Sequence, residues 1–202
     1  MIRELTIEDA EQFAELIKNM YSDLENLEWF SPMPFDVENV RNMLTNPRFY
    51  VIGYYDNDIL CGVSSLDYKC GKLIGKVDFP KECDTSKLVE IGFTMVHSNY
   101  KGNGIMKKLV AHLLNKIKED GFLWVFGKVH KDNLASSTSL IRNGFEICSQ
   151  YLKPVKVAEF KALANEDFFS QKGKENAKIT LSKINENDEE IIVDYNIIIK
   201  KL

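Results

Sequence analysis

The glycine turn at residues 102–104, Gly-Asn-Gly, is the part of the sequence whose residue types best suit the binding of an anion. Residues 88–96 before it alternate between apolar and other side chains, which predicts a strand. Apolar residues at helical spacing follow over residues 105–117, so we expect a helix that begins at the glycines and stops near Gly121. The first turn of a helix presents unpaired N–H groups, and glycine lets a phosphate approach them closely. The pattern therefore predicts a phosphate-binding turn.

Two common nucleotide-binding motifs do not account for this turn. The dinucleotide fingerprint G-x-G-x-x-G requires a third glycine at the position that Lys107 occupies. A phosphate loop of the Walker type does not occur in the sequence either. The turn alone therefore indicates an anion and no particular nucleotide.

Glu90 is the second residue that points to chemistry, because it stands in the middle of an otherwise apolar strand. Regular alternation would place Val89, Ile91, Phe93 and Met95 on one face and Glu90 on the other. An unpaired carboxylate is costly to bury, so we expect Glu90 to have a raised pKa or bonding partners. A raised pKa suits a general base that works near neutral pH. The alternative is a structural acid that is bonded to the backbone or to a lysine.

The elements that follow give this region a recognisable order. Residues 122–129 read as a second apolar strand, and residues 133–143 as a helix closed by Gly144, with Phe145 opening a further strand. Residues 88–145 together resemble the GCN5-related N-acetyltransferase (GNAT) superfamily. Its pattern is a strand, Arg/Gln-x-x-Gly-x-Gly/Ala, a helix, a strand, then Asn-x-x-Ser/Ala and Gly-Phe at a fixed distance. The matching residues here are Asn99, Gly102, Gly104, Asn133, Ser136, Gly144 and Phe145.

The resemblance implies an α/β (mixed α+β) fold with a central, mostly antiparallel twisted sheet and helices on both faces. The sheet is expected to splay apart between two parallel strands at residues 88–96 and 122–129. Acetyl-CoA is the implied co-substrate, with its pyrophosphate on the backbone of residues 102–106 and its pantetheine between the splayed strands like an added strand. For Asn133, the alternative to a cofactor contact is a simple helix N-cap. The implied cofactor-binding residues are Met95, Val96, Asn99, Lys101, Gly102, Asn103, Gly104, Ile105, Met106, Asn133 and Ser136.

The function that the resemblance implies is transfer of an acetyl or other short acyl group from acetyl-CoA to a primary amine, by direct attack in a ternary complex. Glu90 lies in a Val-Glu-Ile context similar to that of the general base in the histone-acetylating branch, and His130 is a second candidate base. Leu140 occupies the position at which many members have a tyrosine that protonates the leaving thiolate. A backbone N–H near Met95 or Val96 is expected to stabilise the oxyanion.

Three other functions stay open at this stage. The chain is also compatible with a non-catalytic acyl-CoA-binding module that regulates another protein. A protein N-terminal or lysine acetyltransferase would have an open groove between the loop at residues 29–35 and the region 153–190. An interaction scaffold would use residues 153–190 as a homodimer interface. Neither the amine acceptor nor the acyl chain length can be read from the sequence.

Composition excludes several classes of function. A length of 202 residues suits a single domain, residues 1–202, and a net charge of −4 provides no basic field for nucleic acid. The four cysteines form no C-x-x-C pair and the three histidines have no ligand spacing, so we expect no metal site. The first residues lack the apolar segment of a signal peptide, and no run of 18 apolar residues occurs. We therefore expect a cytoplasmic protein with no membrane partner.

Outside the central stretch the pattern predicts shorter elements. The expected order is a strand at residues 2–5, a helix at 10–20, a helix capped by Asp36, a hairpin at 49–55 and 59–68, a helix at 157–164, a polar mobile segment at 171–178, and strands at 179–184 and 191–200. We interpret residues 153–190 as an insertion before the last strand.

Overall fold

The computed structural model describes residues 1–202 except 31–32, 34, 70–72 and 186. Ser31, Pro32 and Pro34 of the loop at residues 29–35 therefore lie outside the described residues. The strands are β1 (Ile2–Glu4), β2 (Phe49–Asp56), β3 (Ile59–Asp67), β4 (Leu88–Val96), β5 (Trp124–His130), β6 (Glu146–Lys156) and β7 (Glu190–Lys201). The helices are α1 (Ala10–Ser22), α2 (Val37–Leu44), α3 (Ile105–Glu119), α4 (Leu134–Ile141), α5 (Val157–Ala164) and α6 (Gln171–Ser182).

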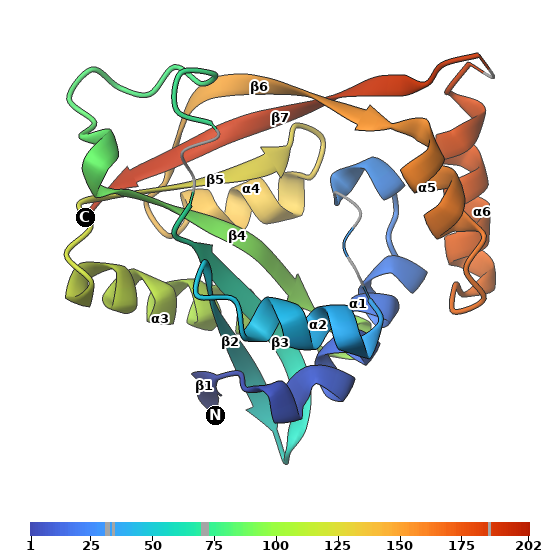
Figure 1. Ribbon diagram of the computed structural model, residues 1–202, viewed down its shortest axis with the longest axis horizontal. Helices are drawn as coiled ribbons and strands as arrows, with labels where there is room; N and C mark the ends of the chain where they lie inside the picture. Colours follow the sequence, from blue (N-terminus) through green and yellow to red (C-terminus); the bar gives the residue numbers. More distant parts are fainter. Residues whose placement is uncertain (31–32, 34, 70–72, 186) are drawn as a thin grey trace.

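One mixed sheet joins the seven strands in the order β1-β2-β3-β4-β5-β7-β6. The pairings are antiparallel except for the parallel pair of β4 and β5. Helices α1 and α2 lie on one face of the sheet and α3 and α4 on the other (Figure 1), and each pair covers its own apolar cluster. The prediction of a mixed α/β fold, with a mostly antiparallel sheet and helices on both faces, is confirmed.

A β-bulge in β4 changes which side chains share a face. Ser64 of β3 lies opposite Thr94, but Leu66 lies opposite Ile91, so three steps on β4 face two on β3. Val89 and Ile91 therefore pack on the α3 side, whereas Phe93 and Met95 pack on the α1 side. The prediction that these four side chains face one way is wrong, because an extra residue reverses the alternation.

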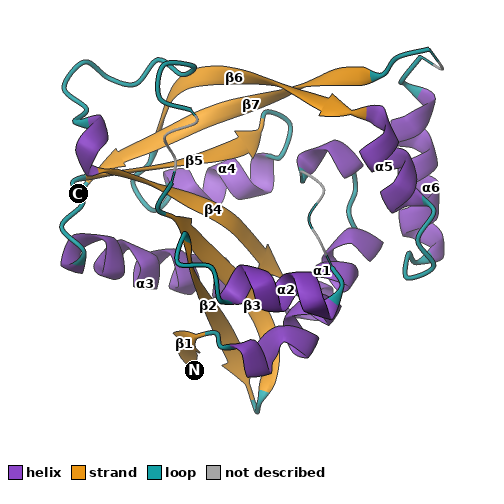
Figure 2. Cartoon of the chain, viewed as in Figure 1, coloured by secondary structure: helices purple, strands orange, loops and turns teal. Residues whose placement is uncertain are grey.

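The C-terminal third also departs from expectation. A mobile segment at residues 171–178 and a strand at residues 179–184 were expected, but residues 171–182 form the single helix α6. Ser170 caps it, since its hydroxyl accepts the N–H of Gly173 at 3.0 Å, and Ala177 and Thr180 are buried. Figure 2 shows α5 and α6 side by side beyond the ends of β6 and β7.

Strand β6 is longer than predicted and passes through Pro154 to Lys156. Proline donates no hydrogen bond, which an edge strand such as β6 tolerates. The helical excursion between β6 and β7 therefore begins at residue 157, four residues later than expected. After the excursion the chain re-enters the main sheet as β7, which lies between β5 and β6. Its interpretation as an insertion in one domain stays a prediction.

Asp9 ties the N-terminal strand to the sheet. Its carboxylate, 5% exposed, accepts hydrogen bonds from Arg3 at 2.6 and 2.8 Å, from the Tyr55 hydroxyl at 2.7 Å and from the N–H of Thr6 at 2.8 Å. The Arg3 guanidinium, helped by the other donors, holds the pKa of Asp9 well below its usual range. The carboxylate is thus a stabilising charge in the folded chain.

We expect Asp9→Asn to lower the free energy of unfolding by about 1.5–3 kcal/mol near neutral pH, the usual worth of hydrogen bonds to a charged group. The native pKa of Asp9 is depressed, so its stabilisation is present above the unfolded pKa of about 3.9 and is lost as the pH falls below it. Urea unfolding at pH 7 and at pH 3 measures this, with the exposed Asp167→Asn as the control. If the difference in the free energy of unfolding between wild type and Asp9→Asn is the same at both pH values, the Asp9 carboxylate is not the stabilising charge.

Within the part of the chain that the structure describes, no helix is long and apolar enough to cross a membrane.

Candidate active site

The parallel strands β4 and β5 separate part of the way along their length. Their pairing runs from Leu88↔Trp124 to Ile91↔Gly127, and beyond it the strands diverge (Figure 1). Past this point β4 pairs with β3 and β5 pairs with β7, so the two edges that face each other carry no described strand partner. A cavity of about 50 Å³ lies at this opening. It is lined by Trp29, Phe30, Ile91, Gly92, Thr94, Met106, Gly127, Lys128, Val129, His130, Asn133, Ser136 and Leu140.

The glycine turn leads from the end of β4 into α3. Gly102 and Gly104 have φ of +83° and +70°, which favours glycine, and a Cβ on either would meet nothing within 4 Å. Gly104 is the N-cap of α3 and provides no side-chain cap, and Lys108 N–H makes the first helical bond, 3.1 Å to the Gly104 carbonyl. No partner is recorded among the described residues for the N–H groups of residues 102–107. The turn thus has the open backbone and free donors that a phosphate requires.

The expected cofactor residues fall into three groups. Met106, Asn133 and Ser136 line the opening between β4 and β5. The side chains of a second group are turned into the core. Ile105, the first residue of α3, is buried. The Met95 side chain is buried on the α1 side and half-buried Val96 packs on the α3 side, so Met95 and Val96 can present only their backbone to the opening. The members on the exposed turn are Asn99, Lys101, Gly102, Asn103 and Gly104.

Asn133 has the capping role that was the alternative to a cofactor contact. Its side-chain oxygen accepts the N–H of Ser136 at 3.1 Å at the start of α4. Both residues also line the opening, so the cap leaves them facing it. Leu140, one helical turn further on, presents an apolar side chain there and no hydroxyl that could act as an acid.

Glu90 is buried and paired. Its carboxylate is 2.9 Å from the ammonium of Lys128, and the side chain of Glu90 is 7% exposed. Burial raises the pKa of Glu90, and the charge of Lys128 opposes that rise. On the neighbouring strand Asp67 lies opposite Glu90 and is itself bonded to Arg48. Lysine as a partner is the structural alternative stated for Glu90, yet the same lysine lines the opening and so connects Glu90 to it.

Lys128 is a site residue that the sequence reasoning missed. Glu90 lies opposite Phe126 in the parallel pair, and Lys128 follows two residues later on the same face. A lysine inside an apolar strand next to a strand with a buried acid was the available signal.

His130 is buried, with 3% of its surface exposed, and lines the opening. Burial lowers the pKa of His130, so the imidazole is neutral at physiological pH. Its Nδ1 accepts the N–H of Asp132 at 3.2 Å, and its Nε2 lies 3.8 Å from the Glu28 carboxylate. An imidazole that accepts at Nδ1 carries its proton on Nε2, so His130 would have to give up the Asp132 bond to take a proton there. This geometry favours Glu90 over His130 as the base.

Trp29 and Phe30 bring the segment after α1 over the opening. Trp29 ends the 3-10 turn η2 (Leu27–Trp29), and its indole N–H is buried with no partner among the described residues. Of the described members of the loop at residues 29–35, Trp29 and Phe30 line the opening, whereas Met33 and Phe35 pack against the apolar cluster on the α1 side. Among the described residues, no cluster of histidine, cysteine, aspartate and glutamate side chains is placed to hold a metal ion.

The comparisons with known proteins agree with this geometry. A family model described as an acetyltransferase (GNAT) domain matches residues 1–146. No protein among the curated sequences matches the chain. The ribosomal-protein-alanine N-acetyltransferase of Brucella melitensis is 18% identical with a TM-score of 0.64, covering 100% of this chain and 99% of that one.

Two further solved structures hold a ligand. YncA from Salmonella typhimurium, solved with its cofactor acetyl-CoA, is 15% identical with a TM-score of 0.64, over 100% of this chain and 93% of that one. The PaiA N-acetyltransferase of Thermoplasma acidophilum, solved with coenzyme A, is 16% identical with a TM-score of 0.60, covering 100% of this chain and 98% of that one. At these identities the likeness concerns the fold. The match over residues 1–146 identifies the family, and the chain belongs to the acetyltransferase (GNAT) family.

Proposed function

We propose that the chain is an N-acetyltransferase that takes an acetyl group from acetyl-CoA and passes it to a primary amine by direct attack in a ternary complex. The observation that carries the proposal is the pairing of β4 and β5, which stops at Ile91↔Gly127 and leaves an opening at the end of which the glycine turn lies. A pantetheine amide chain needs backbone partners along its length, and two unpaired strand edges offer them. The turn offers the pyrophosphate its free N–H donors.

In this proposal the chain binds acetyl-CoA through two sets of residues. The exposed turn, with Asn99, Lys101, Gly102, Asn103 and Gly104, and the first residues of α3, Ile105 and Met106, hold the pyrophosphate. The backbone of Met95 and Val96, with Asn133 and Ser136 across the opening, holds the pantetheine. Acetyl-CoA supplies an activated acyl group as its thioester.

Glu90 is the proposed general base. An ammonium acceptor must lose a proton before its nitrogen can attack, and a carboxylate with a raised pKa is a good acceptor of that proton near neutral pH. Lys128 lies between Glu90 and the opening, so the proton would pass through a water beside this pair. With Leu140 in place of a hydroxyl, the thiolate leaves without a side-chain acid from that position.

Binding is the first prediction to test. Acetyl-CoA at about 100 times its Kd should stabilise the chain by about 2.7 kcal/mol, which raises the melting temperature by several degrees. Gly104→Glu should abolish the shift, because a carboxylate and a side chain then occupy the phosphate position. Gly121→Glu is the matched control, since Gly121 has a φ of +78°, has nothing within 4 Å of its Cβ and lies at the other end of α3.

The outcomes separate cleanly. A shift that is lost in Gly104→Glu and kept in Gly121→Glu supports the site, and thiol release over a panel of amines then tests transfer. Binding without thiol release from any amine would favour a non-catalytic acyl-CoA-binding module. A wild-type chain that neither acetyl-CoA nor longer acyl-CoAs stabilise would overturn the proposal.

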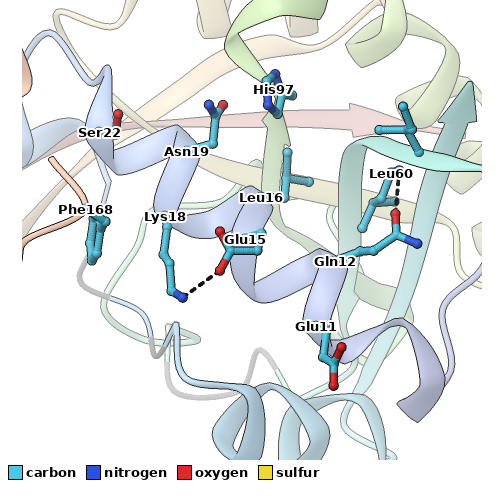
Figure 3. A pocket seen from close by; sticks show the side chains of 11 residues that line it. Glu11, Gln12, Glu15, Leu16, Lys18, Asn19, Ser22, Leu60, His97 and Phe168 are labelled. Atoms are coloured by element: carbon cyan, nitrogen blue, oxygen red, sulfur yellow. Dashed lines mark hydrogen bonds and ion pairs between the residues drawn. The ribbon is translucent and has the colours of Figure 1, made fainter. Parts of the chain in front are cut away.

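A polypeptide acceptor is the second candidate, and an open groove beside α1 favours it. This groove is not the one expected between residues 29–35 and 153–190, because no described residue of 29–35 lines it. A groove of about 540 Å³ runs along the outer side of α1, and Figure 3 shows Phe168, from the excursion between β6 and β7, at one end of it. Glu11, Glu15 and Lys18 line it, and the Lys18 ammonium pairs with Glu15 at 2.7 Å. These two carboxylates and one ammonium leave the groove with a net negative charge, which suits a basic peptide. Peptides with free α-amines and with blocked α-amines but free lysines, included in the amine panel, distinguish N-terminal from lysine acetylation.

A homodimer through residues 153–190 and a cytoplasmic location stay predictions. Sedimentation of the wild-type chain tests the first, and imaging of the tagged chain in cells tests the second.

A further inference from the structure

Trp29 carries a buried polar group and lines the opening between β4 and β5. Its indole nitrogen is buried and has no hydrogen-bond partner among the described residues. The side chain lines the cavity together with Gly92 of β4 and Lys128 of β5, and the cavity reaches Ile91 and Gly127, where the two strands part. A buried N–H without an acceptor is energetically unfavourable. A ligand that brings an oxygen to the indole N–H therefore gains a hydrogen bond that no described residue makes.

The turn that carries Trp29 is fixed by several contacts. Asn26 caps it, and the side-chain oxygen of Asn26 accepts the N–H of Glu28 at 3.0 Å and the hydroxyl of Thr180 at 3.2 Å. Glu28 reaches the Nε2 of His130 at 3.8 Å, and Leu27 is 1% exposed. From α6, the side chain of Asn176 donates to the Leu24 carbonyl at 3.1 Å. These contacts hold the indole in place before any ligand arrives, which is what a preorganised donor requires.

We propose that the indole N–H of Trp29 donates a hydrogen bond to a carbonyl oxygen bound where β4 and β5 part, and that this oxygen belongs to the thioester of the acyl donor. The inference rests on the proposed function. It assigns to this chain a side-chain oxyanion donor from the segment after α1, in addition to any backbone donor of β4. The place favours the thioester, because the cavity is bounded by the last paired residues of both strands and by Asn133 and Ser136.

The reaction makes this bond stronger as it proceeds. When the amine nitrogen bonds to the carbonyl carbon, the C=O electron pair moves to the oxygen, which becomes an oxyanion. When the C–S bond breaks, that pair returns to the carbonyl and the sulfur leaves as a thiolate. The second proton of the nitrogen passes to water, because Glu90 has already taken the first proton from the ammonium. A donor that is in place throughout lowers the barrier most at the oxyanion stage, and removal of one such donor typically costs about 10²–10³-fold in kcat.

Trp29→Phe is the decisive variant, because it removes the N–H and keeps an aromatic ring. We expect kcat to fall by about 10²–10³-fold while the KM of the amine changes little. Trp124→Phe is the matched control, since Trp124 is the other tryptophan, is buried in a separate apolar cluster and should keep the wild-type kcat. It also leaves Trp29 as the only indole, so its fluorescence reports directly on the site. Acetyl-CoA should change that fluorescence more than coenzyme A, which has no thioester carbonyl.

Each result decides between the sources of the oxygen. A fluorescence response that needs the amine, together with a raised amine KM in Trp29→Phe, would assign the N–H to an oxygen of the acceptor and overturn the thioester assignment. Equal responses to acetyl-CoA and coenzyme A with an unchanged kcat in Trp29→Phe would overturn the inference and leave the proposed function standing. A melting temperature that acetyl-CoA does not raise would overturn the proposed function first.

Discussion

Glu90→Gln is expected to lower kcat by about 10²–10⁴-fold, the usual worth of a positioned general base. Glutamine has nearly the shape of glutamate but cannot take a proton from the acceptor. The buried position of Glu90, 5% exposed and 2.9 Å from Lys128, is retained in the variant, so substrate binding should change far less than kcat. Steady-state rates on the amine found in the panel, measured as thiol release, give both parameters.

The pH dependence provides a second signature. Burial raises the pKa of Glu90, so the carboxylate, which is the active form, appears only as the pH rises through that raised value. The wild-type rate should therefore increase with pH over this range, and Glu90→Gln should lack that limb. The free energy of unfolding changes with pH in the opposite direction to the rate, because the native state binds the Glu90 proton more tightly than the unfolded chain does. It falls as the pH rises from the unfolded pKa through the folded one, and the variant removes that slope.

Asp67→Asn is the control that separates a base from a structural acid. Asp67 is the neighbouring buried carboxylate, lies opposite Glu90 and is bonded to Arg48. Its replacement should cost stability without the large loss of kcat. Because the Asp67 charge helps to raise the pKa of Glu90, the rising limb of the pH profile should move to lower pH in Asp67→Asn but should still be present. If Glu90→Gln and Asp67→Asn lose stability alike and both keep that rising limb, Glu90 is a structural partner of Lys128 and the base lies elsewhere.

The part of the site that the sequence predicts well is the part in which local chemistry decides the structure. The glycine turn is predicted by Gly102 and Gly104, two residues that can adopt the positive φ that the turn requires. Helix α3 is predicted by the helical spacing of its apolar residues and by Gly121, which lies just after the end of the helix and has a φ of +78°. Each of these signals lies within a few residues of the structure that it specifies. The capping of α4 by Asn133 is local in the same way.

Features that depend on pairing between distant segments were harder to predict. The bulge in β4 becomes visible only when β3 is laid beside it, and the sequence of residues 88–96 alternates as if none were present. The contact of Glu90 with Lys128 depends on the register of two parallel strands. The position of Trp29 depends on the path of the chain after α1, which no local pattern in the sequence specifies.

Helix α6 shows how tertiary contacts decide a weak local preference. Its first half is polar and contains Gly173, a poor helix former, and its second half has the β-branched Ile179 and Thr180. These residue types favoured a mobile segment and a strand. The helix instead follows from the cap by Ser170 and from packing against α1 and the segment that carries Trp29.

Gly173→Ala is therefore expected to destabilise the chain, against helix propensity. Alanine is better than glycine inside a helix by about 1 kcal/mol, which by itself predicts a more stable variant. A Cβ on Gly173, however, would lie 1.9 Å from the backbone oxygen of Ser22 and 3.0 Å from the ring of Phe169. The oxygen belongs to the last residue of α1 and cannot turn away as a side chain could, so α6 must move. Overpacking of this kind typically costs about 1–3 kcal/mol or more.

The displacement of α6 should also reach the site. Asn176 and Thr180 on α6 hold Leu24 and Asn26, and Asn26 caps the turn that ends in Trp29. Urea unfolding should show the loss of stability, while the exposed Lys174→Ala on the same helix reports propensity alone. In Gly173→Ala below its unfolding transition, kcat should fall while the melting shift with acetyl-CoA persists, because the glycine turn is untouched. A Gly173→Ala chain more stable than wild type would mean that α6 does not dock on α1 in this way, and its support of Trp29 would then have to be given up.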